Sequence, residues 1–166
     1  MNFFFSALVI DRPRTPIQLV SLAIVNEAGH AYYAESGEFN IFDASEDKRS
    51  IICANLDQTH PKKLATIARE AQAFVGDSWV KFWAYNEVKE FEVLCRLLFD
   101  DDSVELWPNL YSELKDELQR NPPGMEEMQH NHHALANARW VRDTWRWLED
   151  LRSAGKEIDS NLLTPP

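Results

Sequence analysis

The feature that most constrains the fold is the run Asn2–Ile10, which is apolar on both of its alternating faces. It is aromatic and β-branched and shows no helical period, which is typical of a strand. A strand that is apolar on both faces has to be covered on both sides, so we expect it in the centre of a sheet. Asp11, Arg12 and Pro13 follow it in place of a small-residue cleavage site, which favours a buried strand over a signal core.

Two further apolar runs follow, Ile17–Val25 and Gly29–Glu35, and they are separated by proline and glycine positions typical of turns. Three runs at this spacing predict an antiparallel meander. The next segment, Gly37–His60, is polar and irregular. It is long for a loop without secondary structure inside a compact domain, and such loops often lie near a functional face or cover a sheet edge.

The second half of the chain alternates apolar patterns of helical period with one short apolar run. These patterns predict a helix opened by Pro61 and ended by Gly76, a buried strand over Val80–Tyr85, and helices over Glu87–Phe99, Asn109–Arg120 and about His133–Ser153. The order is β-β-β-α-β-α-(β)-α-α. It predicts an α/β fold, with a mixed sheet covered by helices on both faces.

Length and charge narrow the choice of function. We expect the 166 residues to form one domain over residues 1–154, followed by a C-terminal tail over residues 155–166. The net charge of −10 argues against a protein that binds mainly to the phosphate backbone of a nucleic acid. It is compatible with an acidic surface that binds a basic protein. No apolar segment reaches the roughly 18 residues of a membrane span. The only cysteines, Cys53 and Cys95, fit a reduced, cytoplasmic setting.

Two segments carry a family resemblance. The first is Phe82-Trp83-Ala84-Tyr85, an aromatic strand at the mouth of the helix that contains Glu90, and the second is His132-His133-Ala134-Leu135-Ala136-Asn137-Ala138-Arg139. The second segment resembles the histidine motif of the DnaQ-like, DEDDh class of 3′→5′ exonucleases. Together with Leu106-Trp107-Pro108 the pattern is similar to the small bacterial and phage exoribonucleases of the RNase AS type. The resemblance runs from Met1 to about Leu151 and implies an RNase H-like domain.

The resemblance also implies a site in which four carboxylates hold two Mg²⁺ ions about 4 Å apart and a histidine activates the attacking water. This chain departs from that pattern at nearly every ligand. Ser6 and Leu8 stand where the family has aspartate and glutamate on the first strand. Glu90 stands for the third acid and Asn137 for the fourth. Only His132, at the position of the general base, is unchanged. Because the ligands of the metal ions are replaced, we expect this histidine to be a vestigial general base.

We therefore expect a catalytically degenerate exonuclease-like protein that needs no cofactor and acts by binding. Tyr85 and Arg139 lie next to the altered motif positions. The expected partner is a protein, such as a basic nucleic-acid-handling or defence machine that a phage-type inhibitor would block. RNA or single-stranded DNA is a second partner class, and the family includes homodimers. The alternative is an active 3′→5′ exoribonuclease with an atypical site that uses Mg²⁺ or Mn²⁺.

Simpler interpretations compete with these. The register that aligns Ser6 and Leu8 with the family acids would be wrong if the first strand were only a core strand. In a separate alternative, Glu90 is an ordinary exposed helix acid near Lys89, because a lone carboxylate binds Mg²⁺ poorly. A zinc site at the histidines before the last helix is disfavoured because they do not share a helical face. On that helix Trp145 is expected to pack in the core, whereas Trp140 and Trp147 share a second face.

Overall fold

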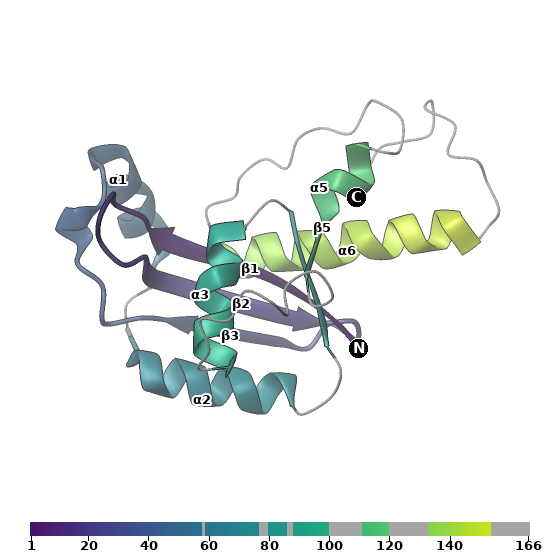
Figure 1. Cartoon of the computed structure of the whole chain (residues 1–166), viewed down its shortest axis with the longest axis horizontal. Coiled ribbons are helices and arrows are strands. Elements are labelled where there is room, and N and C mark those ends of the chain that lie inside the picture. Colours follow the sequence, from purple (N-terminus) through teal and green to yellow (C-terminus); the bar gives the residue numbers. More distant parts are fainter. Residues whose placement is uncertain (58, 77–79, 86–87, 100–110, 120–132, 154–166) are drawn as a thin grey trace.

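The computed structural model describes residues 1–57, 59–76, 80–85, 88–99, 111–119 and 133–153. Within these ranges the chain forms one sheet of five strands in the order β3-β2-β1-β4-β5, with helices on both faces (Figure 1). The strands are β1 (Asn2–Ile10), β2 (Gln18–Asn26), β3 (Ala31–Glu35), β4 (Lys81–Ala84) and β5 (Tyr111–Glu113). The expected α/β class with a mixed sheet is therefore confirmed. The expected tail lies outside the described residues.

Strand β1 is the centre of the sheet, as its two apolar faces predict. It pairs antiparallel with β2, where Phe4 lies opposite Val25, and parallel with β4, where Phe4 lies beside Trp83. β3 continues the antiparallel meander beyond β2, and β5 adds a parallel strand beyond β4. The register of β1 and β2 shifts between Leu8 and Val9. This irregularity lies near the carboxyl end of β1, where bulges often redirect side chains.

One face of the sheet is covered by α2 (Leu64–Val75) and α3 (Val88–Phe99) (Figure 1). Aromatic rings fill this layer: the ring centroids of Phe5 lie 6.1 Å from Phe82 and 5.8 Å from Phe91. The apolar positions of α3 that repeat at a helical spacing are all buried: Phe91, Leu94, Cys95 and Leu98. Burial raises the pKa of the Cys95 thiol to about 12, so this thiol behaves as an apolar core group.

The opposite face is covered by the long helix α6 (Ala134–Ser153), beside which the short helix α5 (Leu114–Gln119) contributes Leu114. The Trp145 ring lies 5.3 Å from Phe4 and 6.2 Å from Trp83, so its expected packing role is confirmed. α6 packs against β1 and β2 of the sheet. It makes most of its contacts with these two strands. Among the described residues, no helix has the length and apolarity to cross a bilayer.

The segment predicted as an irregular loop over Gly37–His60 contains two helices. These are a 3-10 turn, η1 (Ile41–Asp43), and a helix, α1 (Glu46–Asn55), which Ser45 caps by accepting a hydrogen bond from the Lys48 N–H. The periodicity of α1 is weak because Ile52 is its one buried residue. α1 lies at the carboxyl end of β1, where Ile52 packs with Ile10.

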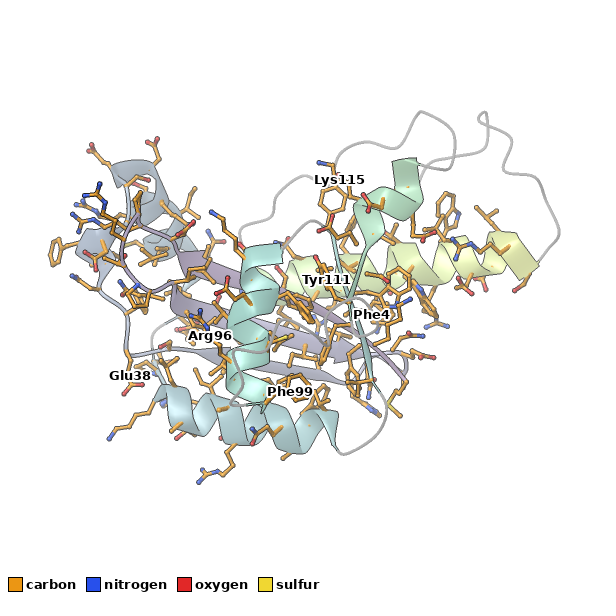
Figure 2. The ribbon with its side chains drawn as sticks, viewed as in Figure 1. Phe4, Glu38, Arg96, Phe99, Tyr111 and Lys115 are labelled. Carbon is orange, nitrogen blue, oxygen red and sulfur yellow. The ribbon has the colours of Figure 1, made fainter. Side chains whose placement is uncertain are left out.

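The start of α2 also differs from the prediction. The helix begins at Leu64, and Glu38 caps it by accepting a hydrogen bond from the Leu64 N–H at 2.7 Å (Figure 2). Pro61 precedes the helix because residues 61–62 follow the edge of β3 instead. The Lys62 N–H donates to the Glu35 carbonyl at 2.8 Å, and Gly37 donates back to the Lys62 carbonyl.

The helix predicted over Asn109–Arg120 is a strand followed by a helix. Tyr111–Glu113 form β5, and α5 begins only at Leu114. The stacking of the Tyr111 ring on Phe91, with centroids 4.4 Å apart, holds this short strand against α3. The leucine spacing hid the strand because it continues through these residues at a helical period. Asp100–Asp102 and Leu106-Trp107-Pro108 lie outside the described residues.

Candidate functional site

Two cross-strand rows of side chains face α6. In the first row Ser6 lies opposite Ala23, and Ala23 lies opposite Tyr33. Residues directly opposite each other in antiparallel strands point to the same face of the sheet. Ala23 and Tyr33 pack in the α6 layer, so Ser6 also faces α6. Ser6 is only 1% exposed, so its hydroxyl belongs to the interior.

The second row lies two residues further along β1. Leu8 is opposite Ser21, and Ser21 is opposite Glu35. Successive side chains of a strand alternate between faces, so this row faces the same way as the first. Ser21 is 1% exposed and Glu35 is 6% exposed. Leu8 itself packs toward the cluster around Ile52 of α1, so the position that the resemblance aligns with a glutamate carries an alkyl side chain.

Hydrogen bonds join the two rows at the β3 edge. Glu35 Oε1 accepts hydrogen bonds from the Tyr33 hydroxyl at 2.8 Å and from the Asp57 N–H at 3.0 Å. Burial, followed by the hydrogen bond to Glu35, raises the pKa of the Tyr33 hydroxyl above its usual range. Tyr33 therefore stays neutral and acts as a donor to the buried carboxylate at physiological pH.

The first turns of α6 lie over these rows. The His133 ring stacks on Tyr33 of β3, with centroids 5.1 Å apart, and the Trp140 ring contacts Tyr85 after β4 at 5.6 Å. Between residues 133 and 140 the helix thus crosses from β3 to β4. Asn137 lies on α6 between these two contacts and is 9% exposed. Ser6 and Asn137 therefore belong to the same interface between the sheet and α6.

Glu90 lies on the first turn of α3, which covers the other face of the sheet. Its side chain is half-buried, and this burial raises the pKa of its carboxyl group, although Lys48 and Lys89 partly oppose the shift. Lys89 also forms an ion pair with Asp11, the residue that follows β1. Glu90 thus lies near the carboxyl end of β1 and near the first turn of α1. It is neither a fully exposed acid nor a member of the α6 layer.

The remaining sequence-predicted residues divide simply. Tyr85 is half-buried against Trp140, and Arg139 is exposed on α6. His132 lies outside the described residues, as does His130. The expectation that Ser6, Glu90 and Asn137 meet His132 in one pocket therefore stays a prediction.

The donor atoms at the positions that the sequence resemblance aligns with metal ligands do not fit a pair of Mg²⁺ ions. Such a pair needs several anionic oxygens. This chain offers a hydroxyl at Ser6, methyl groups at Leu8, an amide at Asn137 and the half-buried carboxyl group of Glu90. Within the described ranges, no group of three or more histidine, cysteine or acidic side chains lies close enough to hold a metal.

A hollow that the sequence analysis missed opens at the carboxyl end of β3. It has a volume of about 190 Å³ and is lined by Tyr33, Ala34, Glu35, Asp57, Thr59, His60 and Lys62. Glu35, the buried acid among the lining residues, is the last residue of β3. In the sequence this strand has no feature that marks it as part of a site. The available signal was the long polar segment up to His60, which was expected near a functional face.

Comparisons with known proteins identify the fold. The sequence matches no protein family model and no curated protein. Among solved structures, a moderately thermophilic exonuclease I from Methylocaldum szegediense matches with a TM-score of 0.66 at 15% identity, over 92% of this chain and 41% of that chain. An E. coli exonuclease I in complex with a 5cy-dT13 oligonucleotide matches with a TM-score of 0.66 at 12% identity, over 92% and 41%.

A product-bound exonuclease I matches with a TM-score of 0.65 at 10% identity, over 92% of this chain and 44% of that chain. The chain thus spans about two fifths of the length of these enzymes. At such identities the likeness shows the fold alone, and this fold agrees with the RNase H-like α/β fold expected from the sequence. These comparisons therefore support the expected fold and do not test the expected site residues.

Proposed function

We propose that this chain is a degenerate relative of the DEDDh exonucleases, nearest in pattern to the RNase AS type, and that it acts by binding. The observation that carries this proposal is the chemistry at the family's ligand positions. Ser6 and Asn137 lie in the interface between β1 and α6 without contributing a charge, and Leu8 contributes no donor atom. An exonuclease scaffold is therefore retained while the anionic ligands of the two-metal mechanism are replaced.

The magnitude of metal catalysis supports the loss of activity. In the two-metal mechanism the ions activate the nucleophile and stabilise both the attacking and the leaving oxygen. A positioned general base alone contributes roughly 10²–10⁴-fold. Phosphate ester hydrolysis without a catalyst is among the slowest biological reactions, so a histidine at position 132 cannot replace the ions.

The partner that fits the charge of the chain is a basic protein. The chain carries 27 acidic and 17 basic side chains, and a surface of this sign steers basic surfaces toward it. A nucleic-acid-handling machine presents such a surface. An inhibitor of phage type that keeps an exonuclease fold would occupy it without cutting nucleic acid.

The test is a nuclease assay followed by reconstruction of the site. The purified chain, incubated with labelled single-stranded RNA or DNA in Mg²⁺ or Mn²⁺, is expected to leave the 3′ ends intact. The four substitutions Ser6→Asp, Leu8→Glu, Glu90→Asp and Asn137→Asp together are expected to create divalent metal binding, measured by titration calorimetry.

A matched control adds the same number of carboxylates at exposed positions, by Ser50→Asp, Ala54→Glu and Ala65→Glu, and is expected to bind no metal. Trimming of RNA from the 3′ end by the unmodified chain, abolished by His132→Ala, would establish an active exoribonuclease and overturn the proposal. Failure of the reconstructed chain to bind metal more tightly than the control would mean that the four positions do not share a site.

A further inference from the structure

The end of the molecule that holds η1 and α1 presents an exposed aromatic ring. Phe42 of η1 is 76% exposed, more than any other large apolar side chain of the described residues. Half-buried apolar side chains of the neighbouring residues pack on the small cluster around Ile52: Phe39, Ile41 and Leu56. A single exposed ring is common, whereas a ring beside further partly exposed apolar groups is typical of an interaction surface.

Hydrogen bonds fix the turn that carries this ring. The Phe42 N–H donates to the Asn40 side chain at 3.2 Å, and the Asn40 N–H donates to Gln18 of β2 at 2.7 Å. Asp43 accepts a hydrogen bond from Gln18 at 2.9 Å and forms an ion pair with Arg12, which follows β1, at 2.8 Å. The backbone under the ring is therefore held before any partner binds, so a contact made by the ring costs little conformational entropy.

Charges of both signs lie around the ring. The guanidinium group of Arg49 is 5.8 Å from the centre of the Phe42 ring. Arg14 is exposed in the turn between β1 and β2, with a φ of 70° that favours glycine over arginine. Glu46 and Asp47 are exposed on the first turn of α1. The β1–β2 turn and the segment of η1 and α1 lie side by side at one end of the molecule (Figure 1).

The balance of charge at this end differs from that of the chain as a whole. Residues 11–14 and 40–50 contain four basic and four acidic side chains, so the net charge of −10 comes from the rest of the chain. Two copies of a chain with this net charge repel each other. The repulsion is smallest where two ends without net charge meet, so this end is the one at which a second copy can approach.

We propose that this end binds a second copy of the chain, in an isologous dimer with the two Phe42 rings at its centre. An isologous interface uses the same surface twice, so that surface has to be complementary to itself. A surface of one sign does not meet this condition. An apolar centre with arginines and acids at its rim does meet it, because the arginines of one copy then lie opposite the acids of the other. The inference goes beyond the binding function proposed above.

Other occupants fit this end less well. A nucleic acid needs an excess of basic groups along its phosphates, whereas bases and acids balance here. A basic protein would meet more acids on the rest of the chain, where the net charge lies. An acidic protein would pair with the arginines and place its own acids against Glu46 and Asp47. A second copy offers an opposite charge to every group of the rim.

The first measurement is sedimentation velocity of the full-length chain alone, from about 10 µM to about 1 mM. We expect an equilibrium of monomer and dimer with a dissociation constant on the order of 100 µM, because a contact around one ring of each copy is small. Phe42→Ala is expected to weaken the association at least tenfold. Phe99→Ala is the matched control and is expected to have no effect, because Phe99 is also exposed but lies on α3, away from this end (Figure 2).

Charge variants test whether the surface is complementary to itself. Arg14→Glu makes the rim acidic, and the double substitution Glu46→Lys and Asp47→Lys makes it basic. Each variant, with its fold checked by circular dichroism, is expected to weaken self-association about tenfold because like charges then meet across the two-fold axis. An equimolar mixture is expected to restore association as a mixed dimer, which native mass spectrometry detects by its mass.

Four results would each overturn the inference. The first is a monomer over the whole concentration range, and the second is unchanged association of folded Phe42→Ala. The third is a mixture of the charge variants that associates no more tightly than either variant alone. The fourth is association that appears only when a single-stranded oligonucleotide is added, which would assign this end to nucleic acid. The measurements use the isolated chain, so their failure would leave the function proposed above untouched.

Discussion

The two faces of the sheet bury different kinds of side chain. Toward α2 and α3, β1 presents the rings of Phe3 and Phe5, which pack against Phe82, Phe74 and Phe91. Toward α6, the same strand presents Phe4 and then Ser6. The sheet and α6 together bury five polar side chains in this second interface: Ser6, Ser21, Glu35, Asn137 and Thr144. The first face is therefore a hydrophobic core, and the second combines a core with a polar layer.

The division within the second face follows the length of α6. Its carboxyl-terminal half packs Trp145 on Phe4 and Trp83, in an apolar contact like that of the other face. Its amino-terminal half stacks His133 on Tyr33 and covers the two polar rows. Burying polar groups lowers stability unless their hydrogen bonds are satisfied, so such a layer in an otherwise apolar core is typical of a functional site.

The largest expected effect lies on the apolar face. Phe5→Ala removes a fully buried ring that contacts Phe82, Phe91 and Tyr111, and it is expected to lower the free energy of unfolding by about 3–5 kcal/mol. Ser6→Ala, one residue on and facing α6, is expected to cost less than about 1.5 kcal/mol. Urea denaturation of both variants measures the contrast, and a larger loss for Ser6→Ala would reverse the assignment of the two faces.

A smaller effect is expected from the tyrosine pair on β3. Tyr33→Phe removes the hydroxyl that donates to the buried Glu35, and it is expected to lower the free energy of unfolding by about 1.5 kcal/mol. Tyr32→Phe is the control on the other face, where the hydroxyl donates to Glu70 at the surface at 3.2 Å. It is expected to cost less than about 0.5 kcal/mol. Equal losses of unfolding free energy in chemical denaturation would show that the buried hydrogen bond of Tyr33 contributes no more to stability than the surface hydrogen bond of Tyr32.

The smallest effect depends on pH and concerns Glu90. Because burial raises the pKa of Glu90 in the folded chain, the folded state holds this proton more tightly than the unfolded state. The stability contributed by the group is therefore lost as the pH rises from its usual value of 4.5 through the raised one. Glu90→Gln is expected to raise the melting temperature at pH 7 and to leave it unchanged at pH 4.

The control for this pH dependence is Glu92→Gln on the same helix. Glu92 forms an ion pair with Arg96 at 2.5 Å near the surface, so its substitution is expected to give no gain in melting temperature at pH 7. A gain at pH 7 that persists at pH 4 in Glu90→Gln would show that the raised pKa is not its cause.

The sequence predicted the elements whose apolar pattern is strong. β1 was placed at the centre of the sheet because both of its faces are apolar, and Trp145 was placed in the core because it continues the inward face of α6. The RNase H-like fold was expected from the order of the elements and from the motif around Asn137, and the match to exonuclease I confirms it. These features depend on local periodicity or on a spaced motif, which a sequence displays directly.

What the sequence did not predict depends on contacts between distant segments. The sequence predicts a loop where the structure has α1, because Ile52 is the one buried residue of this helix. A single buried residue gives no repeating apolar pattern. β5 was read as helix because its residues also satisfy a helical spacing, and the stacking of Tyr111 on Phe91 decides otherwise. The hollow at Glu35 is lined by β3 and by residues after α1, and the Asp57 N–H donates to Glu35 across these two segments. No spacing along the chain indicates such a contact.

The position of β1 between β2 and β4 also bears on how the chain reaches its native state. The meander β1–β2–β3 closes short loops, whereas the parallel pairing of Phe4 with Trp83 must close a loop of almost half the chain. Loop-closure entropy delays such distant pairings during folding. Until β4 docks, one edge of the most apolar strand is open and able to pair with another chain. Substitutions that slow the docking of β4 should therefore promote aggregation during refolding more than they change the native molecule.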